Sequence, residues 1–183
     1  MLLHYNKRSK RFLGDRFMSM LKDKEMKEVV EEFCDESDKL CEQLLDHVDD
    51  LEEDPTNNEI LELFGQKIDR IMGAAKSLEA DKTGKLCELS KKIGYKASQS
   101  HDEALLTLVQ ATLADSVEIL QTLIKSIRTE GVEKTDDINL SAFIKRLYWV
   151  TEKFKDIERA SVSTDEENMD QVEIDSFLKN MKN

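Results

Sequence analysis

Five residues between Asn58 and Leu78 have the types and the spacing of a chemical or docking site. They are Glu62, Gln66, Asp69, Gly73 and Lys76, separated by four, three, four and three positions. In an α-helix this spacing places side chains in one line along one face. A carboxylate there can pair with a partner's lysine, and an amide one turn away can hold a water molecule. Gly73 would leave a gap in the helix surface where a partner loop can approach.

The apolar residues of the same segment predict the helix that carries this line. Ile60, Leu61, Phe64, Ile68, Ile71, Met72, Ala75 and Leu78 recur at three- and four-residue spacing. This is the pattern of a helix that buries one face. The helix is predicted to begin near Asn58 and to end before the sequence DKTGK at 81–85, with the polar line facing solvent. Any exposed helix face carries polar residues, so the spacing alone also fits an ordinary solvated surface.

Four further amphipathic segments predict the rest of the fold. One runs from Met26 to about Glu53 and includes Val29 and Val30 in its apolar stripe; Pro55 follows it and disfavours helix in the residue before it. The others carry apolar stripes over 86–97, 105–127 and from about 141 to 157. Gly131 is a plausible C-cap of the segment at 105–127. Short connections favour antiparallel neighbours, so we expect an all-α, antiparallel four-helix bundle with an extra C-terminal helix.

Composition limits the function. The formal net charge of −12 argues against general nucleic-acid binding, and no run of eighteen apolar residues exists, so no membrane insertion is expected. Three cysteines, at 34, 41 and 87, fall in helical patterns and are expected to be buried, reduced thiols of a cytoplasmic protein. No phosphate-binding loop or metal-ligand spacing is visible, so no metal or cofactor of its own is expected. The aromatic residues Tyr148, Trp149 and Phe154 fit either core or a dimer seam, which leaves a homodimer open.

The two ends of the chain differ from the body. We expect a basic N-terminal arm or helix over 1–25, a bundle over 26–160, a polar flexible linker over 161–169 and an amphipathic peptide over 170–183. The basic arm fits a solvated segment or a contact with an acidic surface. The final peptide fits a tethered segment that folds on a partner, or a terminal helix that packs on its own bundle.

The region from about Val30 to Gly131 resembles the histidine phosphotransfer (HPt) domain of CheA-type chemotaxis kinases. The resemblance rests on LEEDP at 51–55 and on Ile71, Gly73 and Ala75, which fall at the I, G and A positions of the family pattern F-R-x-x-H-x-I-K-G-x-A. It implies an HPt-type bundle whose helical face meets the receiver domain of a response regulator. Asp69, Arg70, Gly73 and Lys76 are the docking residues that this resemblance implies.

The chain departs from the HPt pattern at its chemical centre. Asp69 stands where the family has its phosphorylated histidine, and Met72 replaces the following lysine. The family's chemistry needs a neutral ring nitrogen as nucleophile, which an aspartate does not supply. His4, His47 and His101 lie outside the family context and are interpreted as ordinary surface residues. Phosphotransfer through a histidine is therefore not expected, whereas the docking surface can be retained.

Two shorter segments are similar to CheZ-type phosphatases, which act on the receiver protein CheY. ELFGQKIDRIM looks like their DLTGQ segment followed by IKRMM, and this similarity implies that Glu62 contacts a receiver lysine and Gln66 positions the attacking water. Any Mg²⁺ would belong to the receiver. The final peptide DQVEIDSFLKNM is similar to the CheY-binding peptides of CheZ and of the flagellar switch protein FliM. Its implied contacts are Asp170, Val172, Ile174, Phe177 and Leu178.

Three functions follow as expectations. The first is a chemotaxis or two-component signalling protein that binds a CheY-like receiver without being phosphorylated itself. The second is a CheZ-like phosphatase that uses Glu62 and Gln66. The third is a structural helical-bundle assembly protein with no receiver partner.

Overall fold

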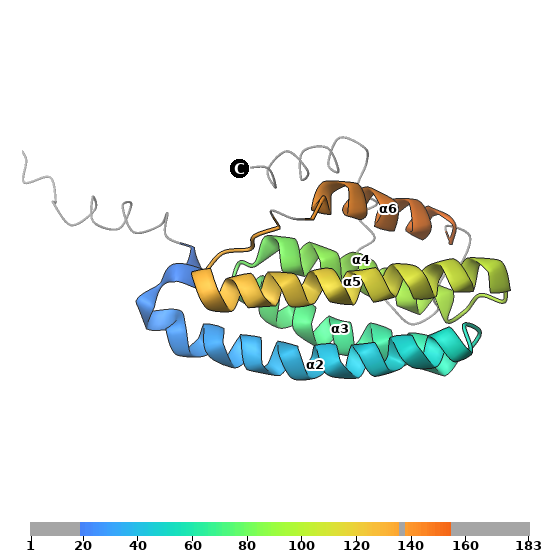
Figure 1. Cartoon of the computed structure of the whole chain (residues 1–183), viewed down its shortest axis with the longest axis horizontal. Coiled ribbons are helices and arrows are strands. Elements are labelled where there is room, and N and C mark those ends of the chain that lie inside the picture. Colours follow the sequence, from blue (N-terminus) through green and yellow to red (C-terminus); the bar gives the residue numbers. More distant parts are fainter. Residues whose placement is uncertain (1–18, 136–137, 155–183) are drawn as a thin grey trace, which may run out of the picture.

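The structure is a computed structural model that describes residues 19–135 and 138–154, and in this part it is all-α. Five α-helices follow two 3₁₀ turns, η2 (Met20–Lys22) and η3 (Lys24–Met26) (Figure 1). The helices are α2 (Lys27–Glu53), α3 (Asn58–Ser77), α4 (Asp81–Ala97), α5 (Glu103–Glu130) and α6 (Leu140–Glu152). The predicted arm, linker and receiver-binding peptide lie outside the described residues, except for the last part of the arm.

The first four α-helices form the bundle, as the sequence predicts. α2 packs against α3 and α5, and α4 packs against the same two helices, so each helix has two bundle neighbours. Consecutive helices are antiparallel, and α6 lies across the outside of α4 (Figure 1). The prediction of an antiparallel four-helix bundle with an extra C-terminal helix is therefore confirmed.

The core is built from the apolar stripes that define the helices. Large side chains such as Leu44, Phe64, Ile93 and Leu120 are completely buried, each contributing about 1.5–3 kcal/mol of hydrophobic stabilisation. The prediction for Val29 is wrong, since this side chain is 46% exposed. Val30, one position on, is turned about 100° around the helix and occupies the inward stripe instead.

Most helix ends have local caps. The side-chain oxygen of Asn57 accepts a hydrogen bond from the Ile60 amide at the start of α3, at 3.2 Å. Gly131 ends α5 in the left-handed conformation, with φ of 66°, and its amide donates to the Ile127 carbonyl. The predicted C-cap is confirmed.

α3 ends before DKTGK, as predicted, but α4 begins earlier than its apolar stripe over 86–97 indicates. DKTGK forms the first turns of α4, and the turn between the helices occupies only 78–80, with Glu79 at φ of 57°. The cap comes from a distant residue. The Glu133 carboxylate accepts from the amides of Lys82 and Thr83, at 3.1 and 2.7 Å, and from the Thr83 hydroxyl at 2.7 Å. A cap fifty residues away in the chain leaves no local sequence signal.

The aromatic residues at the end of α6 have different surroundings. Phe154 is buried and Tyr148 packs against the core, whereas Trp149 is 51% exposed with the Lys153 ammonium 4.6 Å from its ring centroid. The core interpretation is therefore wrong for Trp149. α6 itself ends at Glu152, earlier than predicted, and residue 157 lies outside the described residues.

All three cysteines are buried free thiols, as predicted. Burial raises the pKa of Cys34 to about 11 and of Cys41 to about 12, and it also raises the pKa of Cys87. These thiols are therefore neutral and poorly reactive at pH 7. Among the described helices, none is long and apolar enough to cross a membrane.

Candidate functional site

The polar line of α3 lies on the outside of the bundle. Gln66, Gly73 and Lys76 are exposed, and Glu62 and Asp69 are half-buried. The apolar positions between them, such as Phe64, Ile68 and Ile71, are buried in the core. The amphipathic pattern thus turns the predicted line to solvent along one helix face.

A close crossing of α3 and α4 holds this face in place. A Cβ atom at Gly65 would lie 2.6 Å from the Tyr95 ring, and one at Gly94 would lie 3.1 Å from the Leu61 carbonyl oxygen. The absence of side chains at both glycines therefore lets the two helices approach each other. As a result, the α4 residues Lys91 and Tyr95 lie beside the α3 line.

Asp69 is paired across this crossing. Its Oδ1 atom lies 2.8 Å from Lys91 Nζ, and the side chains are 42% and 17% exposed, respectively. The same ammonium is 5.8 Å from the centroid of the Tyr95 ring. Because the ion pair is partly shielded from water, it fixes the lysine better than a fully exposed pair would. Asp69, in the middle of the α3 line, therefore has its carboxylate in an ion pair with α4.

A second ionic group lies about two turns of α3 further along the face. Glu88 Oε2 lies 3.1 Å from Lys76 Nζ, and Glu88 Oε1 lies 3.0 Å from the largely buried Lys85 Nζ. Burial alone would raise the pKa of Glu88, but the hydrogen bonds and charges of Lys85 and Lys76 lower it below its ordinary value. The carboxylate is thus ionised at neutral pH and holds Lys76 against α4.

Arg70 and Gly73 complete the surface. Arg70 is exposed and forms an ion pair with Glu36 of α2, so it lies toward the α2 side of α3, away from Lys91. Gly73 faces open space, because a Cβ atom there would have no neighbour within 4 Å. The gap predicted at this glycine is present on the isolated chain. We call Gln66, Asp69, Gly73, Lys76 and Lys91 the α3–α4 face.

Glu62 and Gln66 lie one helical turn apart on the same side of α3. The Gln66 side chain is exposed, and within the described residues its amide makes no hydrogen bond. It is free to donate to one group and accept from another in a bound partner, or to hold a water. None of this requires a cavity in the chain itself.

The histidines do not supply a nucleophile on this face. Within the described residues they are His101, exposed before α5, and His47 on α2. His47 is not an ordinary surface residue as predicted, because both ring nitrogens are buried without a hydrogen-bond partner in the described part of the chain. Burial, and secondarily the charge of Lys67, lower its pKa. This imidazole is therefore neutral at pH 7.

Sequence reasoning missed the α4 half of the face. The close crossing of α3 and α4 brings Glu88, Lys91 and Tyr95 next to α3. From the sequence alone, it was not predicted that Gly65 and Gly94 allow this crossing. The small residues Gly65 and Gly94, on segments predicted to be neighbouring helices, are the signal that could have located it.

Comparison with known proteins leaves the site to be interpreted from its own geometry. No family model matches the chain, and no curated protein or solved structure matches it. Among the residues that the structure describes, no group of three or more histidine, cysteine, aspartate or glutamate side chains could hold a metal ion.

Proposed function

We propose that this chain binds a CheY-like response-regulator receiver domain through the α3–α4 face, as an HPt-like module that is not itself phosphorylated. The observation that carries the proposal is the outward orientation of the α3 line around Asp69, with Asp69 neutralised by Lys91. Asp69 lacks the imidazole nucleophile of the phosphotransfer family, but the helix surface around it stays available to a partner.

The charges of the face favour this partner. The resemblance to HPt domains implies contact with the acidic active site of a receiver. Exposed Lys76 and Arg70, together with Lys91, supply positive charge on either side of the line. The open position at Gly73 allows a partner loop to approach the α3 backbone. Charge complementarity of this kind mainly orients the encounter and rejects wrong partners.

The peptide at 170–183 provides a second contact in this proposal. It lies outside the described residues, and its part rests on its similarity to CheY-binding peptides. Two weak sites on one chain raise the overall affinity, because binding at one site increases the effective concentration at the other.

Binding is tested by NMR with the full chain and a CheY-like receiver, phosphorylated or unphosphorylated. Amide signals of Gln66, Asp69 and Gly73 should shift on titration, while those of Thr107 and Ala111 on α5 should not. Shifts confined to α5 and α6, or no shift with any receiver, would refute the α3–α4 face and favour a structural assembly role.

A second candidate function, CheZ-like dephosphorylation of the receiver, is favoured by the unoccupied amide of Gln66 one turn from Glu62. In this reaction the receiver provides the metal and the phosphoryl group, and the chain positions the attacking water. Phosphate release from the phosphorylated receiver is the measurement. Gln66→Ala should remove any acceleration, and Gln99→Ala, at another exposed glutamine, should retain it. If wild-type chain gives no acceleration, only the binding function remains.

A further inference from the structure

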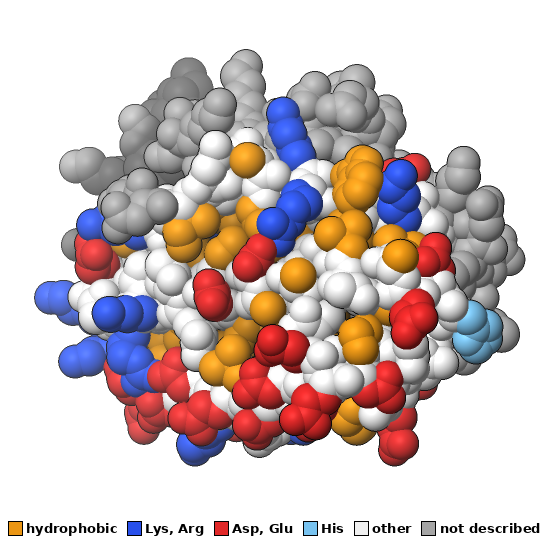
Figure 2. Space-filling view, turned by 45° about the vertical axis from the view of Figure 1, so that its right-hand side comes forward, with side chains coloured by type: hydrophobic (Ala, Val, Ile, Leu, Met, Phe, Trp, Pro, Cys, Tyr) orange, Lys and Arg blue, Asp and Glu red, His pale blue; other side chains and the backbone are white. Residues whose placement is uncertain are grey.

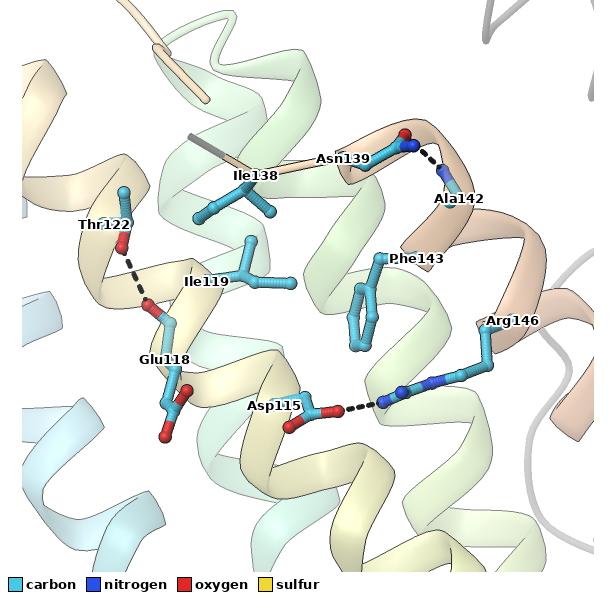
Figure 3. A pocket seen from close by; sticks show the side chains of 9 residues that line it. All are labelled: Asp115, Glu118, Ile119, Thr122, Ile138, Asn139, Ala142, Phe143 and Arg146. Atoms are coloured by element: carbon cyan, nitrogen blue, oxygen red, sulfur yellow. Dashed lines mark hydrogen bonds and ion pairs between the residues drawn. The ribbon is translucent and has the colours of Figure 1, made fainter. Parts of the chain in front are cut away.

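An apolar groove separates α5 from the start of α6, away from α3. Its volume is about 480 Å³, and Ile119, Ile138, Ala142 and Phe143 line it. Figure 3 shows Ile119 and Phe143 pointing into the space between the helices, with Asp115 and Arg146 closing one end. The Arg146 guanidinium also stacks on the Phe143 ring, 4.7 Å from its centroid.

We propose that this groove is the intramolecular docking site of the chain's own C-terminal segment, 170–183. The segment carries Ile174, Phe177, Leu178 and Met181 at spacings of three, one and three, which form one helical stripe. Laying such a stripe into a groove between two helices is a common mode of helix recognition. The apolar side chains of the groove and of the segment would then cover each other.

The length of the chain allows this contact. Ile174 lies twenty positions after Phe154, a stretch that spans up to about 65 Å when extended. The groove lies along the first half of α6, a helix of thirteen residues with a length of about 20 Å. The segment can therefore fold back over α6 with chain to spare, and its tethering favours the intramolecular contact.

The charges on the two sides of the groove complement those of the segment. On the α6 side lies exposed Arg146, which pairs with Asp115 across one end of the groove, and on the α5 side lies the exposed Glu118. The segment has acidic Asp170, Glu173 and Asp175 in its first half, and Lys179 and Lys182 in its second half. Its acidic half can face α6 and its basic half α5. The highly acidic surface of α2 offers no such pairing for the acidic half.

The docked segment would have a regulatory effect, and this step alone rests on the proposed receiver binding. Ile174, Phe177 and Leu178 are the same side chains that the proposed receiver contact needs. Docking in the groove therefore competes with the receiver for the segment. The apparent affinity of the chain for the receiver falls in proportion to the fraction of chains whose segment is undocked.

The contact is tested in the full chain without any receiver. A nitroxide is attached at Ser176→Cys, which lies off the apolar stripe, and the buried native thiols do not react. Methyl NMR signals of Ile119 and Ile138 should be lost, while those of Ile60 and Ile68 on α3 should persist. Persistence of the Ile119 and Ile138 signals would overturn the proposal. The signals would also persist if the N-terminal arm filled the groove in place of the C-terminal segment.

Two controls sharpen the result. Ala142→Arg fills the groove from an exposed position and should restore the Ile119 and Ile138 signals, whereas Ala111→Arg, at an exposed alanine on α5, should not. A mixture of spin-labelled chain and isotope-labelled chain without the nitroxide tests for a second copy. Loss of signal in that mixture would assign the groove to another molecule and overturn the intramolecular contact. Receiver affinity does not enter either measurement, so failure here is distinct from failure of the proposed function.

Discussion

At the scale of single residues, Gly73 and Gly94 have opposite environments although both lie inside helices. A methyl group at Gly73 would project into open space, so Gly73→Ala should stabilise the fold by about 0.5–1 kcal/mol through lower unfolded-state entropy. A methyl group at Gly94 would lie 3.1 Å from the Leu61 carbonyl oxygen, and α3 would have to move. Gly94→Ala should therefore cost about 1–3 kcal/mol. Urea unfolding of the two variants checks the pair, and equal effects would contradict the close crossing.

His47 should make stability depend on pH. The unfolded chain binds a proton at this residue near the ordinary pKa of 6.5, but burial and Lys67 lower the folded-state pKa despite the nearby carboxylates of Asp46 and Asp50. The unfolded state thus binds more protons, and the free energy of unfolding falls as pH drops through and below 6.5. Chemical unfolding between about pH 7 and pH 5 measures this slope. His47→Gln should reduce it, and His101→Gln should not; an unchanged slope in His47→Gln would show that the imidazole is solvated.

At the scale of helices, α3 must begin at the correct residue for its line to face outward. The Asn57 side chain caps this start through its bond to the Ile60 amide. Asn57→Ala should lower the free energy of unfolding by about 1 kcal/mol, and Asn57→Asp should retain most of the stability. Thermal or urea unfolding measures both. Equal stability of the alanine and aspartate variants would mean that the cap does not stabilise α3.

The helices were largely predictable because their apolar stripes are regular. Periodicity located α2, α3 and α5 within a few residues, and Gly131 marked the end of α5. Two features were not predictable. Glu133 caps α4 from a loop fifty residues away, so the start of α4 at DKTGK has no local sequence signal. Val29 is apolar but one helical step outside the buried stripe, which a list of apolar positions does not reveal.

At the scale of the whole molecule, charge separates the surfaces. α2 carries twelve acidic residues and two lysines, and acidic side chains gather along the lower edge of the bundle, where α2 runs (Figure 2). This edge would repel an acidic partner, whereas the α3–α4 face presents Lys76 and Lys91, each in an ion pair with a carboxylate. If the proposed function holds, this charge distribution would favour the approach of an acidic partner at the α3–α4 face.

Only the α3 half of the candidate site could be predicted from the sequence. The α3 residues follow from periodicity and from the resemblance to HPt and CheZ proteins. The α4 residues follow only from the three-dimensional crossing at Gly65 and Gly94. The ion pair of Asp69 with Lys91 joins the two halves, and no local pattern links residues on separate helices.

The most direct test of the account is receiver affinity after the gap at Gly73 is filled. Gly73→Phe adds a ring where a Cβ atom meets nothing within 4 Å, so the fold should persist while a partner loop is excluded. Ala111→Phe, at an exposed position on α5, is the matched control. Titration calorimetry with a CheY-like receiver should give at least about a tenfold loss of affinity for Gly73→Phe, equivalent to about 1.4 kcal/mol, and none for Ala111→Phe. Equal affinity of both variants and the wild-type chain would contradict docking on the α3–α4 face.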